Sequence, residues 1–128
     1  MKKILIIDDE PNLVELIQIR LESHEFEILT ASNGVVGYAI AKDEKPDLIV
    51  LDINMPTMDG YQFIKEIKWH ADLKNIPILI LTAKAYLKDL FEEEYICGFV
   101  TKPFNSNLLI SNIKDILDES RNNESNYL

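Results

Sequence analysis

The sequence predicts a doubly wound α/β domain: a five-stranded parallel sheet covered on both faces by helices, in five successive strand–helix units. Five short apolar runs alternate with five segments of helical periodicity. Such alternation is typical of a parallel sheet that helices cover on both sides. The 128 residues, 47% of them hydrophobic and 27% charged, have the size and composition of one globular domain.

The first two strands are predicted at residues 3–7 and 26–31, where short, mostly apolar runs occur. The helix after the first strand begins at Pro11, which suits a first helical turn, and ends near Ser23. The next helix follows Ser32-Asn33-Gly34, a turn that can also cap it. We expect the apolar face of that helix to be formed by Val35, Val36, Ala39 and Ile40.

The third and fourth strands are predicted at residues 48–51 and 78–81, as runs buried on both faces. Asp52 follows the third strand and Thr82 follows the fourth. The helix between them is predicted to bury Phe63, Ile64 and Ile67.

The last part of the chain is predicted to form a helix, a strand and a final helix. The fourth helix is marked by Tyr86, Leu87, Leu90 and Phe91. A short strand at residues 99–101 ends at Lys102, and the final helix ends near Glu119. Its apolar stripe is Leu109, Ile113, Ile116 and Leu117. We therefore predict one domain over residues 1–119 and a polar C-terminal tail over residues 120–128.

Composition and charge exclude several classes of partner and location. The net charge of −9 argues against direct binding to nucleic acid, because phosphate backbones repel such a surface. No apolar run reaches the roughly 20 residues that span a bilayer, and the run at residues 4–7 is too short for a signal peptide. We expect a cytoplasmic protein with no membrane association. Cys97 is the one cysteine, which excludes an internal disulfide, and we expect it to be a small core residue.

Polar residues stand where the predicted strands end: Asp8 and Asp9, then Asp52, Thr82 and Lys102. Taken alone, each has an ordinary structural interpretation, since Asp after a strand is often a turn former or a helix cap. In a parallel sheet, however, the carboxyl ends of the strands meet at one edge. Three carboxylates that converge repel one another, and a bound cation relieves that repulsion.

This set of residues predicts phosphoryl transfer. Hard oxygen ligands in small number suit Mg²⁺. Phosphoryl transfer needs positioning and neutralisation of charge, which Mg²⁺, Lys102 and the Thr82 hydroxyl can supply. Asp52 is then the nucleophile, and an aspartyl phosphate is the product.

Four segments, in order along the chain, resemble the receiver domains of response regulators, the CheY-like family of two-component signalling. The segments are residues 7–11, 51–60, 81–83 and 101–104, and the resemblance covers about residues 2–119. It implies the flavodoxin-like fold, with strand order 2-1-3-4-5. It also implies a response regulator that accepts a phosphoryl group from a sensor histidine kinase or a histidine phosphotransfer protein. Such a protein signals to a downstream protein, here unknown, and catalyses only its own phosphorylation and dephosphorylation.

The resemblance also implies roles for the metal site. Asp52 is similar to the phosphorylated residue. Asp9, Asp52 and the backbone carbonyl of Asn54 are expected to bind Mg²⁺ directly, with Mn²⁺ as a possible substitute, and Asp8 is expected to act through a metal-bound water. Asn54 and Lys84 occupy positions that usually tune the lifetime of the phosphate.

Further residues match the switch of the family. Thr82 matches the switch threonine, Lys102 the phosphate-pairing lysine and Phe99 the switch aromatic. The Lys102–Pro103 peptide bond is expected to be cis, as cis bonds are largely confined to proline.

The segment between Thr82 and Lys102 departs from the family pattern. It spans 102 − 82 = 20 positions, fewer than is usual, and residues 92–98 replace the family's small-residue segment. Glutamates at 92–94 oppose the dipole of a helix that ends there. We therefore predict that the fourth helix is short, displaced or frayed, and that the output surface is non-standard.

Two other functions are considered. A haloacid-dehalogenase-type phosphatase has a catalytic Asp two positions after its nucleophile, where this chain has Asn54. A pseudo-receiver would be an interaction module that never cycles phosphate. The acidic pair, Thr82 and Lys102 favour the phosphoacceptor.

Overall fold

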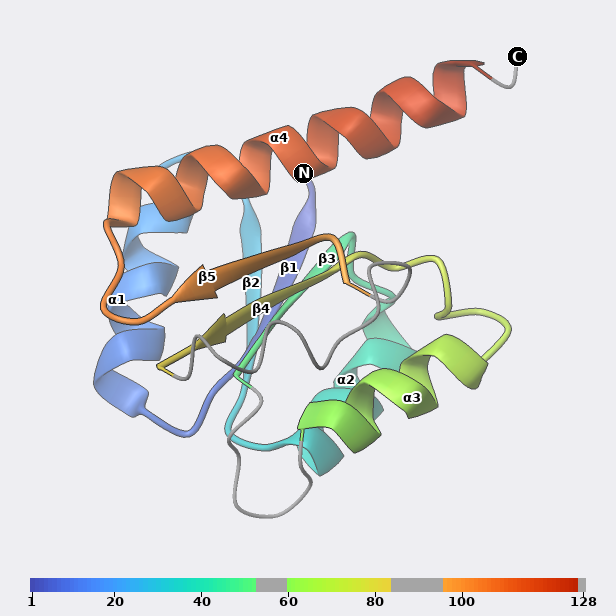
Figure 1. Ribbon diagram of the computed structural model, residues 1–128, viewed down its shortest axis with the longest axis horizontal. Coiled ribbons are helices and arrows are strands. Elements are labelled where there is room, and N and C mark those ends of the chain that lie inside the picture. The colour runs from blue at the N-terminus through green and yellow to red at the C-terminus, as the bar shows by residue number, and fades with distance from the viewer. Residues whose placement is uncertain (53–59, 84–95, 127–128) are drawn as a thin grey trace.

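The structure is a computed structural model that describes residues 1–52, 60–83 and 96–126 (Figure 1). Its elements, in chain order, are β1 (Lys3–Ile7), α1 (Pro11–Glu22), β2 (Glu27–Ala31), α2 (Gly34–Glu44), β3 (Leu48–Leu51), α3 (Gly60–Trp69), β4 (Ile78–Thr82), β5 (Gly98–Thr101) and α4 (Ser106–Asn126). The helix predicted around residues 86–91 lies outside the described residues, as do the glutamates at 92–94. The label α4 therefore belongs to the final helix of the chain.

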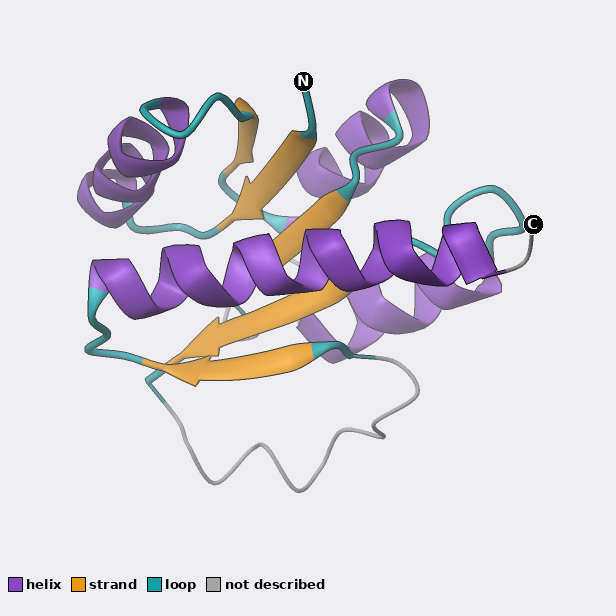
Figure 2. Cartoon of the chain, turned by 90° about the horizontal axis from the view of Figure 1, so that it is seen from above, coloured by secondary structure: helices purple, strands orange, loops and turns teal. Residues whose placement is uncertain are grey.

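The five strands form one parallel sheet in the order β2-β1-β3-β4-β5, as predicted. Figure 2 shows them side by side, with α4 lying along one face of the sheet. Helices α1 and α4 pack on that face, and α2 and α3 pack on the other (Figure 1). The doubly wound α/β architecture is confirmed.

Burial of both sheet faces explains why the strands read as continuous apolar runs. In β1, Ile4 and Ile6 join the core under α1 and α4, while Leu5 and Ile7 join the core under α2 and α3. All four side chains are buried. A strand buried on both faces has no place for a polar residue until it ends, so its first polar neighbour lies at the sheet edge.

Helix α2 packs on the sheet through a different face from the one that we predicted. Asn33 caps the helix as expected, since its side chain accepts a hydrogen bond from the Val36 amide at 2.9 Å. The predicted apolar face is wrong in part, because Val35 and Val36 are 57% and 44% exposed and Ala39 is also exposed. The buried residues are the small ones, Gly34, Gly37 and Ala41.

The reason is the close approach of α2 to β1. A Cβ atom added to Gly37 would overlap the side chain of Ile7, so either the buried Ile7 side chain or the helix would have to shift. This close contact favours small residues on the buried face of α2, and the valines point outward.

Helix α4 is longer than predicted. It continues to Asn126 rather than ending near Glu119, and Figure 1 shows its C-terminal end extending past the sheet. The chain has no Gly or Pro between residues 106 and 126, so no strong stop signal interrupts the helix. Three predicted core residues, Leu109, Ile113 and Leu117, are buried, and Ile116 packs against them partly buried.

One further prediction is wrong. Cys97 is exposed rather than part of the core, because it directly precedes β5 at the edge of the sheet. Its Sγ lies 3.2 Å from the carbonyl oxygen of Ile78. In the described part of the chain, none of the helices combines the length and the apolar character that a membrane span requires.

Candidate functional site

The polar residues at the strand ends converge on one edge of the sheet. Asp8 follows β1, and Asp52 follows the adjacent β3, whose register pairs Ile7 with Leu51. The Asp52 amide donates to the carbonyl of Ile7 at 2.9 Å, which holds the two strand ends together. Thr82 ends β4, and Lys102 follows β5.

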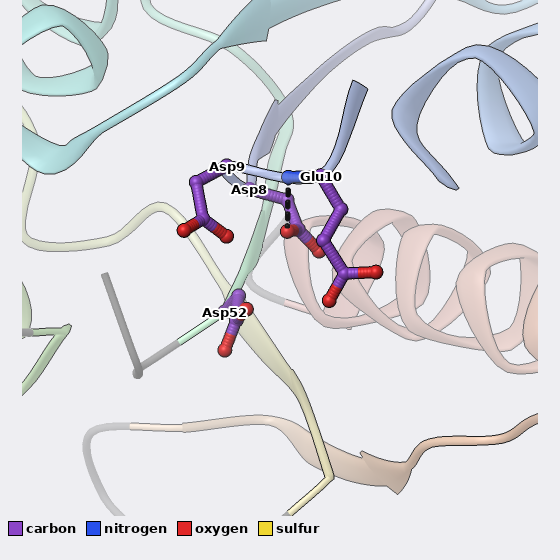
Figure 3. A group of neighbouring side chains, drawn as sticks. All are labelled: Asp8, Asp9, Glu10 and Asp52. Atoms are coloured by element: carbon purple, nitrogen blue, oxygen red, sulfur yellow. Dashed lines mark hydrogen bonds between the residues drawn. The ribbon is translucent and has the colours of Figure 1, made fainter. Parts of the chain in front are cut away.

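Four carboxylates gather at this edge. Asp8, Asp9, Glu10 and Asp52 each offer an oxygen, and these oxygens lie within 4.8 Å of one another. Figure 3 shows the four side chains pointing toward a common space. Asp8 and Asp52 are only 3% and 6% exposed, whereas Asp9 and Glu10 are exposed. Asp8 Oδ1 accepts a hydrogen bond from the Glu10 amide at 3.0 Å, which orients the Asp8 carboxylate (Figure 3).

The ammonium of Lys102 pairs with three of these carboxylates. Its Nζ lies 2.9 Å from Asp8 Oδ2, 3.3 Å from Asp52 Oδ2 and 3.2 Å from Glu10 Oε1. The Lys102 amide donates to the Thr82 carbonyl at 2.8 Å, so the lysine is also held to the end of β4. The peptide bond between Lys102 and Pro103 is cis, as the family resemblance implied.

Burial and charge shift the pKa values of two groups. Burial is the largest cause that raises the pKa of Asp8, and the charge of Asp52 adds to it. The hydrogen bonds from Lys102 and from the Glu10 amide oppose this increase without cancelling it. For Lys102, burial lowers the pKa, but the hydrogen bond to Asp8 and the charges of Asp52 and Asp8 outweigh burial and raise it. Lys102 is therefore charged at neutral pH.

The donor set fits a hard divalent cation. All of its ligand atoms are carboxylate oxygens, which Mg²⁺, Mn²⁺ and Ca²⁺ prefer. Among the described residues, four carboxylates around the Lys102 ammonium leave a surplus of negative charge in a partly buried space. The cluster is thus close enough and negative enough to hold a cation.

Thr82 and Phe99 lie on the same face of neighbouring strands. Phe99 pairs with Ile80 in the register of β4 and β5, and Thr82 follows Ile80 by two positions, so all three side chains face α2 and α3. Thr82 is buried, and Phe99 is partly buried against the core of that face. The two proposed switch residues are therefore diagonal neighbours at the site edge.

Most of the predicted site residues are brought together, and one participant was missed. Asp8, Asp9, Asp52, Thr82 and Lys102 meet at the same edge. Asn54 and Lys84 lie outside the described residues. Glu10 was noted only as part of a motif, yet it pairs with Lys102. The signal available in the sequence was its place directly after two aspartates and before Pro11.

A family model described as the response regulator receiver domain matches residues 4–114. The chain is 40% identical over 121 residues to the alkaline phosphatase synthesis transcriptional regulatory protein PhoP of Bacillus subtilis, covering 93% of this chain and 50% of that protein. It is 34% identical over 119 residues to Protein PilH of Pseudomonas aeruginosa, covering 91% of this chain and 98% of PilH. The chain thus spans about half the length of PhoP and nearly all of PilH.

Solved structures share the fold closely. The chemotaxis response regulator CheY4 of Vibrio cholerae matches with a TM-score of 0.84 at 30% identity, over 91% of this chain and 98% of that one. The response regulator protein TrrA of Thermotoga maritima, in complex with Mg²⁺-BeF, matches with a TM-score of 0.82 at 34% identity, over 91% of this chain and 99% of that one.

Proposed function

The chain belongs to the family of response regulator receiver domains, and from that premise we propose that it is a phosphoacceptor of a two-component phosphorelay, phosphorylated on Asp52. The observation that carries the proposal is the setting of Asp52. Its carboxylate is buried at the end of a central strand, beside three other carboxylates and 3.3 Å from the ammonium of Lys102. This setting offers a nucleophilic oxygen and a cation for the transferred group.

In the proposed reaction, an Asp52 oxygen attacks the phosphorus of a phosphohistidine on a histidine kinase or a histidine phosphotransfer protein. The P–N bond breaks, and its electron pair returns to the imidazole nitrogen. Lys102 moves from the carboxylates to a phosphoryl oxygen, since a phosphoryl group offers more negative charge than a single carboxylate. The Thr82 hydroxyl donates to another phosphoryl oxygen.

Mg²⁺ is the proposed cofactor, with Mn²⁺ as a substitute. Asp9, Asp52 and the backbone carbonyl of Asn54 would hold it, and Asp8 would act through a bound water. When bound, the cation neutralises charge on the phosphoryl oxygens. The excess of carboxylates at the sheet edge supports this assignment. The binding of Mg²⁺-BeF by TrrA, a relative at 34% identity, supports it as well.

We propose that phosphorylation is read out through Thr82 and Phe99. Movement of Thr82 toward the phosphate vacates space on the shared face of β4 and β5, which Phe99 can then fill. The two packings exchange population, and the surface near β5 and α4 changes for a downstream protein. The location proposed for this signalling is the cytoplasm. Residues 1–119 are proposed as the receiver domain, with residues 120–128 as a polar extension.

The experiment that tests the function is phosphorylation by a small donor. The protein is incubated with phosphoramidate and Mg²⁺, and its intact mass is measured. The proposal predicts the gain of one phosphoryl group, no gain in a chelator, and no gain in Asp52→Asn. An unmodified wild-type chain would instead identify a pseudo-receiver.

A further inference from the structure

Glu10 differs in exposure from the two buried aspartates that also pair with Lys102. Its Oε1 lies 3.2 Å from Lys102 Nζ, but its side chain is 60% exposed, whereas that of Lys102 is 12% exposed. The contact therefore lies at the mouth of the site, between the buried carboxylates and solvent.

The backbone of Glu10 is held by a hydrogen bond, whereas its side chain does not cap the helix that follows. The Glu10 amide donates to Asp8 Oδ1, and Pro11 begins α1 directly after it. Glu10 occupies the N-cap position of α1 but makes no capping hydrogen bond with its side chain. The carboxylate is thus anchored at its base and directed to Lys102 rather than to the helix amides.

We propose that Glu10 is a positioning residue that competes with the phosphoryl group for Lys102 and so slows the phosphorylation of Asp52. This inference rests on the proposed function of Asp52. When Asp9 and Asp52 hold a cation and Asp8 is bound to it through a water, the oxygens of Asp8 and Asp52 are less available to Lys102. Glu10 then becomes the main remaining carboxylate for Lys102 among the residues that the structure describes.

Glu10 opposes phosphoryl transfer in two ways. Glu10 occupies one of the contacts of the Lys102 ammonium, so a phosphoryl oxygen has to share that charge with it, and the Glu10 carboxylate repels the incoming negative charge. At the same time, Glu10 adds negative charge near the cation site and therefore favours cation binding. Removal of Glu10 should act on these two quantities in opposite directions, which loss of a merely structural residue would not do.

The test uses phosphoramidate, a donor that needs no docked partner protein. An Asp52 oxygen forms the new P–O bond, the P–N bond breaks, and the nitrogen, already protonated, leaves as ammonia. The rate is followed by intact mass at saturating Mg²⁺. The affinity for Mg²⁺ alone is measured by calorimetry without donor, and thermal melting confirms folding.

Glu10→Gln is compared with the wild type and with Glu15→Gln, a matched control. Glu15 is an exposed residue of α1 near Asp8 and Asp9, and it is not one of the described carboxylates that pair with Lys102. We expect Glu10→Gln to phosphorylate about two- to fivefold faster at saturating Mg²⁺, as the loss of a partly exposed ion pair predicts, and to bind Mg²⁺ a few-fold more weakly. Glu15→Gln should leave the rate unchanged.

A second variant separates the effect of the contact with Lys102 from the effect of the negative charge at position 10. Glu10→Asp keeps the negative charge but is too short to retain the contact with Lys102, so it should phosphorylate faster than the wild type while binding Mg²⁺ equally well. A Glu10→Gln rate equal to or below that of Glu15→Gln would overturn the inference. Absence of any phosphorylation of the wild type would instead overturn the proposed function.

Discussion

The Nζ of Lys102 lies 2.9 Å from Oδ2 of Asp8, although the two residues are 94 positions apart in the sequence. The pair joins the ends of β1 and β5, which are separated in the sheet by β3 and β4. The Lys102 ammonium thus links Asp8, at the end of β1, to Asp52, at the end of β3. The stability of the unphosphorylated protein should therefore depend on this one lysine.

Replacement of Lys102 by Met keeps the aliphatic stem and removes the charge. In chelator, the free energy of unfolding should fall by about 2 kcal/mol, because two buried carboxylates lose their counter-charge. Urea unfolding measures this change, and Mg²⁺ should restore part of it by replacing the lost positive charge.

The matched control for Lys102→Met is Lys3→Met. Lys3 Nζ pairs with Glu44 at the same distance of 2.9 Å, but the two side chains are 34% and 44% exposed. Solvent screens an exposed pair, so its loss should change the stability far less than the loss of Lys102 does. Equal losses of unfolding free energy in the two variants would contradict the claim that the ion pairs of Lys102 stabilise the fold.

Asp8→Asn should stabilise the metal-free protein near neutral pH. Burial raises the pKa of Asp8 above its ordinary value of 3.8, so the protonated, neutral form is more favoured in the folded state than in the unfolded chain. The stability that a group with a raised pKa contributes is full below 3.8 and is lost as pH rises through the folded pKa. Asn mimics the neutral form at every pH.

The advantage of Asp8→Asn should therefore shrink as pH falls through the folded pKa toward 3.8, where wild-type Asp8 itself becomes protonated. Urea unfolding at a series of pH values in chelator measures the difference. A variant less stable than the wild type across the whole series would show that the ion pair with Lys102 outweighs the cost of burying the Asp8 carboxylate.

Gly37→Ala should destabilise the fold by about 2 kcal/mol, because the added methyl group overlaps Ile7 and forces α2 away from β1. Thermal or urea unfolding provides the measurement. Val35→Ala on the same helix is the control, since Val35 is exposed and its truncation should change the free energy of unfolding by less than about 0.5 kcal/mol. An unchanged stability of Gly37→Ala would mean that the helix and strand can separate without cost.

Lys45→Gly should stabilise the protein by about 1 kcal/mol. Lys45 ends α2 with a φ of 45°, a left-handed conformation that glycine adopts without the steric cost paid by other residues. The same change at Lys114, an exposed position inside α4, should instead cost about 1 kcal/mol. Losses of stability in both variants would rule out relief of backbone strain at Lys45.

The three central strands and most of the site could be predicted because β1, β3 and β4 are buried on both faces. Such strands remain apolar until they end, and Asp8, Asp52 and Thr82 therefore mark the sheet edge in the sequence itself. Parallel topology then brings these positions together without any knowledge of loop structure.

The predictions that failed concern features that residue patterns do not determine: the buried face of α2, contacts between turns, and the end of α4. The periodicity of α2 allows more than one buried face, and only the close approach of Gly37 to Ile7 decides between them. The contact between Glu10 and Lys102 depends on how the turn after β1 and the turn after β5 approach each other, which residue patterns do not encode. The extension of α4 to Asn126 lacked a pattern because polar residues without Gly or Pro fit either a helix or a tail.

The central claim is that the Asp52 carboxylate becomes an acyl phosphate. The most direct test is reduction with borohydride after treatment with phosphoramidate and Mg²⁺, followed by peptide mapping, because borohydride converts an aspartyl phosphate to homoserine. We predict homoserine at position 52 and aspartate at positions 8 and 9. Homoserine at another position, or none in a wild-type chain exposed to donor and Mg²⁺, would contradict the assignment of Asp52.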